Sequence, residues 1–174
     1  MTEAPKTYMN SRGEQVIEIG MSGSRQGMTE IQKAILIKIL EGKCGLAHHG
    51  DCVGSDSDFH DILRTYYPDK WKIVIHPPEK DALRAFKLGD IIYPQKPYLK
   101  RNRDIVDSCN VFLGFPKDKQ EVGGTWSTIN YFRRIQELEF GVGRNPRTGT
   151  IIMPNGDIGH ILVEGKMGHK LAIQ

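Results

Sequence analysis

Short apolar segments alternate with amphipathic ones along most of this chain, and this alternation limits the possible folds more than any other feature. Between the strand-like segments, apolar residues recur at intervals of three and four, which is the spacing of a helix. Strands that alternate with helices form a mostly parallel sheet with helices on both faces. We therefore predict an α/β fold. The strand-like segments are residues 15–21, 44–48, 71–75 and 111–115.

The two ends of this pattern carry local signals of their own. Thr29 is followed three residues later by a glutamine, the spacing of a capping box, so we predict that a helix begins there. Near the C-terminus, Asn155-Gly156 is a turn signal between apolar residues 150–153 and 158–163. These residues predict a C-terminal β-hairpin.

The bulk properties indicate one globular domain. The chain has 174 residues, of which 39% are hydrophobic and 26% charged. We expect a loose arm over residues 1–14 and a single domain over residues 15–174. Three cysteines without a C-x-x-C pair indicate a reducing compartment. The N-terminus lacks a signal peptide's apolar stretch, and no apolar run reaches the roughly 18 residues of a membrane span. We expect a cytoplasmic protein with no membrane association.

A glycine-rich turn, GMSGSRQGMT at residues 20–29, follows the first predicted strand. The start of the next helix favours anions, and an arginine offers a planar set of donors. We predict that Ser22, Gly23, Ser24 and Arg25 contact a phosphate or ribose. The glycine spacing differs from the dinucleotide fingerprint G-x-G-x-x-G. An ordinary strand-to-helix turn with a surface arginine is therefore the alternative.

A second glycine-rich loop lies in the segment HHGDCVGSDSDFH, residues 48–60. Gly50 and Gly54 would permit close approach of the backbone to a ligand. Asp51 is predicted to hold a ribose hydroxyl, and Asp56 or Ser55 to cap the following helix. We count Gly50, Asp51, Gly54 and Asp56 among the ligand-binding residues.

The histidines and acids of this segment also invite a metal-site interpretation. Their spacing does not match the paired His and Cys spacings of zinc sites. We therefore predict that His48 packs within a strand, that His60 lies on a helix face, and that the protein holds no metal or other cofactor.

The segment RNRDIV lies on a predicted helix over residues 98–108. Arg101 and Asp104 have i, i+3 spacing, which is typical of a solvated helix face. Asn102 and Arg103 are candidate ligand contacts if this helix borders the pocket.

The turn EVGGTWSTIN, residues 121–130, joins the strand at 111–115 to a helix predicted to begin near Thr125 or Trp126. Two successive glycines are costly unless the backbone must approach something closely. With the hydroxyl groups that follow and the helix dipole, they predict a phosphate cradle. A plain glycine-rich helix start is the alternative. The predicted contacts are Gly123, Gly124, Thr125, Trp126, Ser127 and Thr128.

As a set, these motifs resemble the SLOG superfamily, whose Rossmann-like domains include the Lonely Guy phosphoribohydrolases and the DNA-processing protein A core. The motifs GMSGSRQGMT, HHGDCVGSDSDFH, IHPP, KPYLKRNRDIVD and GGTWSTINYFRR occur in this order, and the resemblance covers residues 15–160. It implies a nucleotide-type ligand across the strand ends, with its phosphate at Gly123, Gly124 and Thr125. It also implies a homodimer.

One departure from the family favours binding over catalysis. The Lonely Guy motif P-G-G-x-G-T-x-x-E ends in a glutamate, and Thr128 occupies that position here. Cleavage of an N-glycosidic bond needs a carboxylate near the developing oxocarbenium ion. We therefore expect a protein that senses or sequesters an ADP-ribose-like or cyclic nucleotide signal without turnover.

Two other functions remain open. A nucleotide N-glycosidic hydrolase or transferase would need Asp51, Asp56 or Glu121 as its carboxylate, and Arg25 as a phosphate clamp. Binding of single-stranded nucleic acid is disfavoured, because the net charge is only +3 and no basic-aromatic run occurs.

Overall fold

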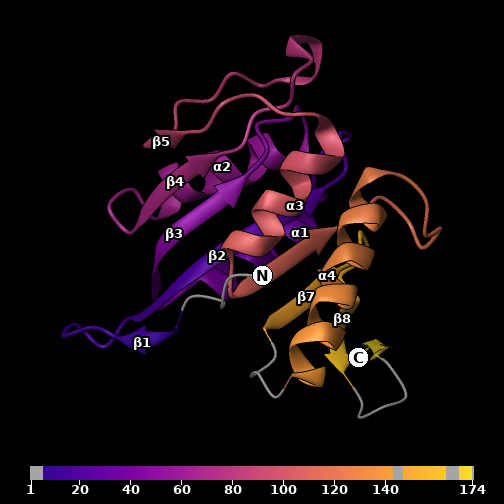
Figure 1. Cartoon of the computed structure of the whole chain (residues 1–174). Helices are drawn as coiled ribbons and strands as arrows, with labels where there is room; N and C mark the ends of the chain where they lie inside the picture. The colour runs from indigo at the N-terminus through magenta and orange to yellow at the C-terminus, as the bar shows by residue number, and fades with distance from the viewer. Residues whose placement is uncertain (1–5, 143–146, 164–168, 174) are drawn as a thin grey trace.

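The computed structural model describes residues 6–142, 147–163 and 169–173, where strands and helices alternate as the sequence predicts (Figure 1). The strands are β1 (Tyr8–Met9), β2 (Gln15–Gly23), β3 (Lys43–His49), β4 (Trp71–Ile75), β5 (Ile91–Ile92), β6 (Val111–Phe115), β7 (Thr148–Ile152), β8 (Ile158–Val163) and β9 (His169–Ile173). The helices are α1 (Glu30–Leu40), α2 (Ser55–Tyr66), α3 (Tyr98–Ser108) and α4 (Gly124–Gly141), with a 3₁₀ turn at Asp81–Leu83.

The nine strands of the described residues form one sheet in the order β5-β4-β3-β2-β6-β7-β8-β9, with β1 paired to β2. The strands from β5 to β7 in this order are parallel, whereas β8 and β9 continue the sheet antiparallel. Helices α3 and α4 pack together on one face, and α1 and α2 on the other (Figure 1). The predicted Rossmann-like α/β architecture and its C-terminal hairpin are confirmed.

The central strand β2 shows how the sequence permits this arrangement. Its side chains Ile17, Ile19 and Met21 are buried in the core. On the opposite face, α3 approaches closely because Gly20 has no side chain; a Cβ there would lie 2.9 Å from Cys109 Sγ. At the far end of the loop after β2, Thr29 caps α1 in a complete capping box, as predicted. None of the described helices is long and apolar enough to cross a membrane.

Three strands lie where no strand is predicted: β9, which pairs with β8, and two very short strands. Tyr8 and Met9 of the expected loose arm form β1, which pairs antiparallel with the beginning of β2; residues 1–5 lie outside the described part. Ile91 and Ile92 form β5 within the long connection after β4. Both strands are only two residues long, too short for side-chain periodicity to reveal them.

The topology places a crevice at the carboxyl ends of β2 and β6. The chain leaves β2 for α1 on one face of the sheet and leaves β6 for α4 on the other (Figure 1). Adjacent parallel strands whose connections diverge in this way open a crevice between the two loops, and ligands of such sheets bind there.

Candidate ligand-binding site

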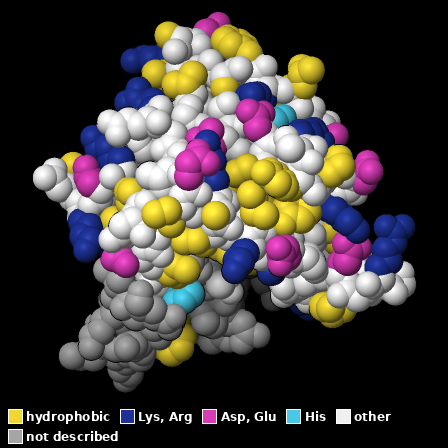
Figure 2. Space-filling view, turned by 180° about the vertical axis from the view of Figure 1, so that it is seen from behind, with side chains coloured by type: hydrophobic (Ala, Val, Ile, Leu, Met, Phe, Trp, Pro, Cys, Tyr) yellow, Lys and Arg dark blue, Asp and Glu magenta, His cyan; other side chains and the backbone are white. Residues whose placement is uncertain are grey.

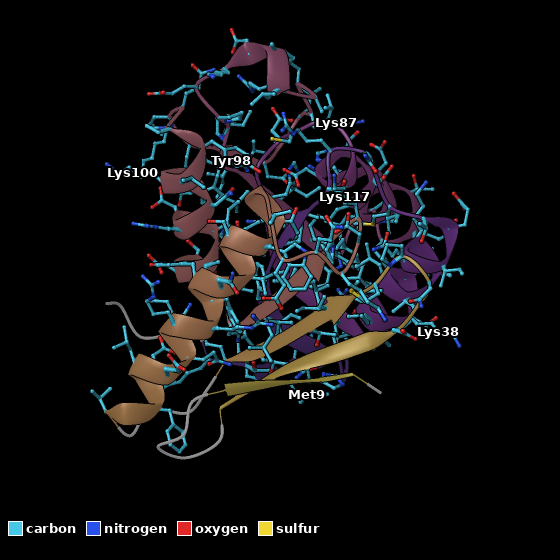
Figure 3. The ribbon with its side chains drawn as sticks, turned by 90° about the vertical axis from the view of Figure 1, so that its right-hand side faces the viewer. Met9, Lys38, Lys87, Tyr98, Lys100 and Lys117 are labelled. Carbon is cyan, nitrogen blue, oxygen red and sulfur yellow. The ribbon has the colours of Figure 1, made fainter. Side chains whose placement is uncertain are left out.

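The loops after β2 and β6 enclose a cavity of about 230 Å³ at this crevice, here called the crevice cavity. The predicted contacts Gly23, Ser24 and Arg25 therefore lie in the same site as the turn at residues 122–126. In Figure 3, Tyr98 and Lys117 lie in the upper half of the view and Met9 in the lower half. The lining residues are Gly23, Ser24, Arg25, Gln26, Tyr98, Pro116, Lys117, Val122, Gly123, Gly124, Thr125 and Trp126.

The two glycines of the turn serve different purposes. Gly123 is the N-cap of α4 and has φ 92°, a conformation that favours glycine. Nothing lies within 4 Å of the place where its Cβ would be. A Cβ on Gly124, in contrast, would lie 2.2 Å from Tyr98 Oη. Gly124 thus makes room for a side chain of the protein itself, whereas Gly123 leaves its side of the turn open.

The N-terminus of α4 and two cations face the crevice cavity. No side chain caps this end of α4, so the N–H groups of its first turn remain available to a ligand. Arg25 and Lys117 line the cavity from the two strand ends, and neither forms an ion pair within the described residues. Burial raises the pKa of Tyr98, so its hydroxyl stays neutral and can donate a hydrogen bond.

A second cavity, here called the interhelical cavity, begins on the other side of Gly123 and extends between α3 and α4. Its volume is about 350 Å³. Of the predicted contacts, Asn102, Arg103, Ser127 and Thr128 line this cavity, whereas Gly124, Thr125 and Trp126 line the crevice cavity. Gly123 lines both. The lining residues are Leu99, Asn102, Arg103, Glu121, Gly123, Ser127, Thr128, Asn130, Tyr131 and Arg134.

The loop after β3 is packed against other parts of the protein. Asp51 is fully buried, and its carboxylate accepts hydrogen bonds from Arg84 Nε at 2.9 Å and from the Lys87 N–H at 2.9 Å. It therefore holds the long connection after β4 in place. A Cβ on Gly50 would lie 1.0 Å from Arg101 Nη1, so the space beside this glycine is already occupied. Neither residue lines the crevice cavity.

The predicted cap of α2 is wrong. The N-cap is Gly54, without a side-chain hydrogen bond. Ser55 Oγ donates to the Ser24 carbonyl at 2.7 Å, and the Asp56 carboxylate accepts from two backbone N–H groups of its own loop at 3.1 Å. Burial raises the pKa of Asp56, although the nearby Arg101 guanidinium opposes this. These groups fasten the loop after β3 to the loop after β2.

The carboxylates considered as catalytic candidates are placed very differently. Asp51 and Asp56 are buried and bonded within the protein. Glu121 is 53% exposed, lies 3.7 Å from Arg133, and lines the interhelical cavity. Thr128, at the position of the family's glutamate, donates its hydroxyl proton to the Gly124 carbonyl at 2.9 Å. Of these four side chains, only Glu121 has a carboxylate beside the glycine turn.

The solvated ion pair predicted within α3 is also wrong. Arg101 is buried; it stacks on the Tyr98 ring at 4.9 Å and donates to Cys52 Sγ at 2.8 Å. Asp104 instead pairs with Lys96. Local spacing suggested a surface pair because the polar partners of Arg101, Cys52 and Asp56, lie more than 40 residues away in the sequence.

His48 at the end of β3 and His60 on α2 are packed as predicted. His48 Nδ1 lies 3.0 Å from His76 Nε2, and His49 Nε2 lies 3.0 Å from His60 Nδ1. Burial lowers the pKa of His49 and His60, and lowers that of His76 to about 3. In the described part of the chain, no three His, Cys, Asp or Glu residues are grouped to hold a metal ion.

Sequence reasoning missed five residues of the crevice cavity, of which Tyr98 and Lys117 carry the side chains that matter most for a ligand; the others are Gln26, Pro116 and Val122. Lys117 had a usable signal, since it is a cation two residues after the end of a buried strand. Tyr98 had none, because its contact with Gly124 joins two helices that are distant in the sequence.

Comparison with protein-family models, with curated proteins and with solved structures finds no match to this chain. The SLOG resemblance therefore rests on the motifs alone and stays a prediction.

Proposed function

We propose that this protein binds a nucleotide or a nucleotide-derived signal, ADP-ribose-like or cyclic, in the crevice cavity and holds it without turnover. One observation carries the proposal: both glycine turns, the uncapped start of α4 and two cations without an ion pair among the described residues line one cavity at the crevice between β2 and β6. The motif resemblance to the SLOG superfamily supports the same ligand class.

The phosphate is assigned to the first turn of α4. Free N–H groups and the positive end of the helix dipole favour an anion there. Arg25 and Lys117 add two positive charges from the neighbouring strand ends. Arg25 offers paired donors to phosphate oxygens, and Lys117 acts as a point charge.

The ribose or base is assigned to the aromatic side of the cavity. Tyr98 and Trp126 both line it, and the Trp126 indole already donates to the Asp118 carbonyl at 3.3 Å. The neutral Tyr98 hydroxyl is the donor available to a sugar or base oxygen. Aromatic side chains with a few polar groups are typical of small-molecule sites.

The absence of turnover is inferred from the carboxylates. Stabilising an oxocarbenium ion needs a carboxylate beside the sugar. Asp51 and Asp56 are held by internal hydrogen bonds, and Thr128 replaces the family's glutamate. The alternative, an N-glycosidic hydrolase or transferase, depends on Glu121, which is exposed next to the turn.

The test is retention on a filter followed by chromatography. The protein is mixed with AMP, ADP-ribose, cyclic ADP-ribose, NAD and cyclic dinucleotides, then filtered, and the retained protein is denatured. We expect one class to be retained and recovered intact. Arg25→Gln and Lys117→Gln should each weaken retention, whereas Lys38→Gln, an exposed cation on α1, should not.

Two outcomes would contradict the proposal. If every compound passes into the filtrate, the crevice cavity is not a nucleotide site. If free base or ribose phosphate appears, and Glu121→Gln abolishes its release, the protein is the alternative enzyme.

The expected homodimer and cytoplasmic location stay predictions. Figure 2 shows hydrophobic side chains gathered on the rear face of the molecule. Ile31 of α1 and Tyr66 of α2 are each more than half exposed. Light scattering after size-exclusion chromatography would determine the oligomeric state.

A further inference from the structure

We propose that the ligand carries two separate phosphate groups, one in the crevice cavity and the other in the interhelical cavity. This inference rests on the proposed function, because it assigns the first phosphate to the start of α4. It adds a second anion site that distinguishes bisphosphorylated or cyclic dinucleotides from simple mononucleotides.

The two cavities meet at Gly123, which lines both. This residue is exposed and has no side chain, and no atom lies within 4 Å of the position of a Cβ. A ligand can therefore pass from one cavity to the other across the outer side of the turn without displacing a side chain at this position.

The interhelical cavity presents unpaired positive charge. Arg103 of α3 and Arg134 of α4 line it, and neither forms an ion pair among the described residues. Arg103 lies over the Tyr131 ring, 5.3 Å from its centre, which limits its orientations. The acidic residue of the lining, Glu121, lies 3.7 Å from Arg133. Two arginines from facing helices suit a phosphate, whose oxygens accept paired donors.

A buried amide without a regular hydrogen bond gives independent support. The Asn102 side chain also lines the interhelical cavity and is only 4% exposed; its Nδ2 interacts with the Tyr98 hydroxyl but forms no hydrogen bond of regular geometry among the described residues. An amide group has two N–H donors, and a buried one that lacks a regular hydrogen bond has room for a further acceptor. A phosphate oxygen or a ribose hydroxyl in this cavity would supply the acceptor.

The sizes of the cavities agree with a ligand that fills both. Sites for small organic ligands usually measure about 300–1,000 Å³, and the crevice cavity, at about 230 Å³, lies below this range. The interhelical cavity adds about 350 Å³. The chemistry shared by the candidate ligands is two phosphates separated by at least one ribose.

The experiment is calorimetric titration with AMP, adenosine 3′,5′-bisphosphate and cyclic di-AMP. We expect at least one of the two-phosphate compounds to bind about tenfold or more tightly than AMP, because a second charged group is engaged. The double variant Arg103→Gln/Arg134→Gln should bring the ratio of the two affinities close to one. Lys38→Gln removes a distant positive charge of α1 and should leave the ratio as in the wild type.

Failure of this inference can be distinguished from failure of the proposed function. If AMP binds as tightly as both two-phosphate compounds, the second site is wrong and the nucleotide site stands. The same conclusion follows if the double variant keeps the ratio. If no nucleotide binds the wild type in titration or on the filter, the proposed function itself is wrong.

Discussion

Gly54 and Gly123 share the same positive φ but have opposite surroundings. Each is the N-cap of a helix, α2 or α4, each lacks a side-chain cap, and their φ angles are 91° and 92°. A Cβ on Gly54 would lie 2.3 Å from the Arg25 carbonyl oxygen, whereas a Cβ on Gly123 would meet nothing within 4 Å. The same turn chemistry therefore closes the loop after β3 and leaves the loop after β6 open. A glycine-rich helix start becomes a candidate ligand site only where the fold leaves space beside it.

The largest expected effect comes from adding a methyl group to each glycine. Gly54→Ala combines a strained positive φ with a clash against backbone, so it should lower the free energy of unfolding by about 4 kcal/mol. Gly123→Ala carries only the strain of φ and should cost about 1–2 kcal/mol. Urea denaturation measures both. Equal losses would show that the two turns are not packed differently.

The closed loop should also depend on its buried carboxylate. Asp51→Asn keeps the shape but weakens the charged hydrogen bonds with Arg84 and the Lys87 N–H, at an expected cost of about 2 kcal/mol. Ligand affinity of the folded protein should be unchanged, since Asp51 does not line the crevice cavity. Denaturation and titration on the same sample separate the two quantities. A loss of ligand affinity with unchanged stability would show that Asp51 belongs to the binding site.

Acid should destabilise the protein through the buried histidines at the ends of β3 and β4. Because the pKa of His76 is lowered from 6.5 to about 3, the unfolded chain binds its proton more readily than the folded protein. Its contribution is complete above pH 6.5 and is lost as the pH falls towards 3, by about 1.4 kcal/mol per pH unit. Denaturation midpoints between pH 7.5 and 5.5 should follow this trend. In His76→Gln the slope should be shallower by that amount.

The smallest expected effect is at the open turn. Glu121→Gln removes a partly exposed partner of Arg133 at 3.7 Å and should change stability by less than about 0.5 kcal/mol. Under the binding proposal, the retained nucleotide is recovered intact from both wild type and variant. Product formation that depends on Glu121 would instead support the hydrolase.

The order of strands and helices was predictable because it depends on local signals. The apolar segments predict the central strands, Thr29 predicts the start of α1, and Asn155-Gly156 predicts the hairpin. The roles of polar residues were less predictable. Asp51 looked like a ribose contact because acids in glycine loops often are. Its partners, Arg84 and the Lys87 N–H, lie more than 30 residues away.

The candidate site was predicted in part for the same reason. The two glycine turns follow strands that become neighbours in the parallel sheet, so their meeting in the crevice cavity follows from topology. Local pattern could not show that Arg101 is buried or that Gly124 accommodates Tyr98. Both facts depend on how α3 lies across the sheet, which only packing decides.

The contact between Tyr98 and Gly124 also suggests a route to chemical control of the protein. The phenol ring occupies the space that a larger residue at position 124 would need. Shortening it, as in Tyr98→Ala, would create a recess in the wall of the crevice cavity. A ligand analogue with a matching bulky substituent would enter the altered site and be rejected by the original one. The variant and its matching analogue would allow this protein to be targeted selectively among other proteins that bind the same natural compound.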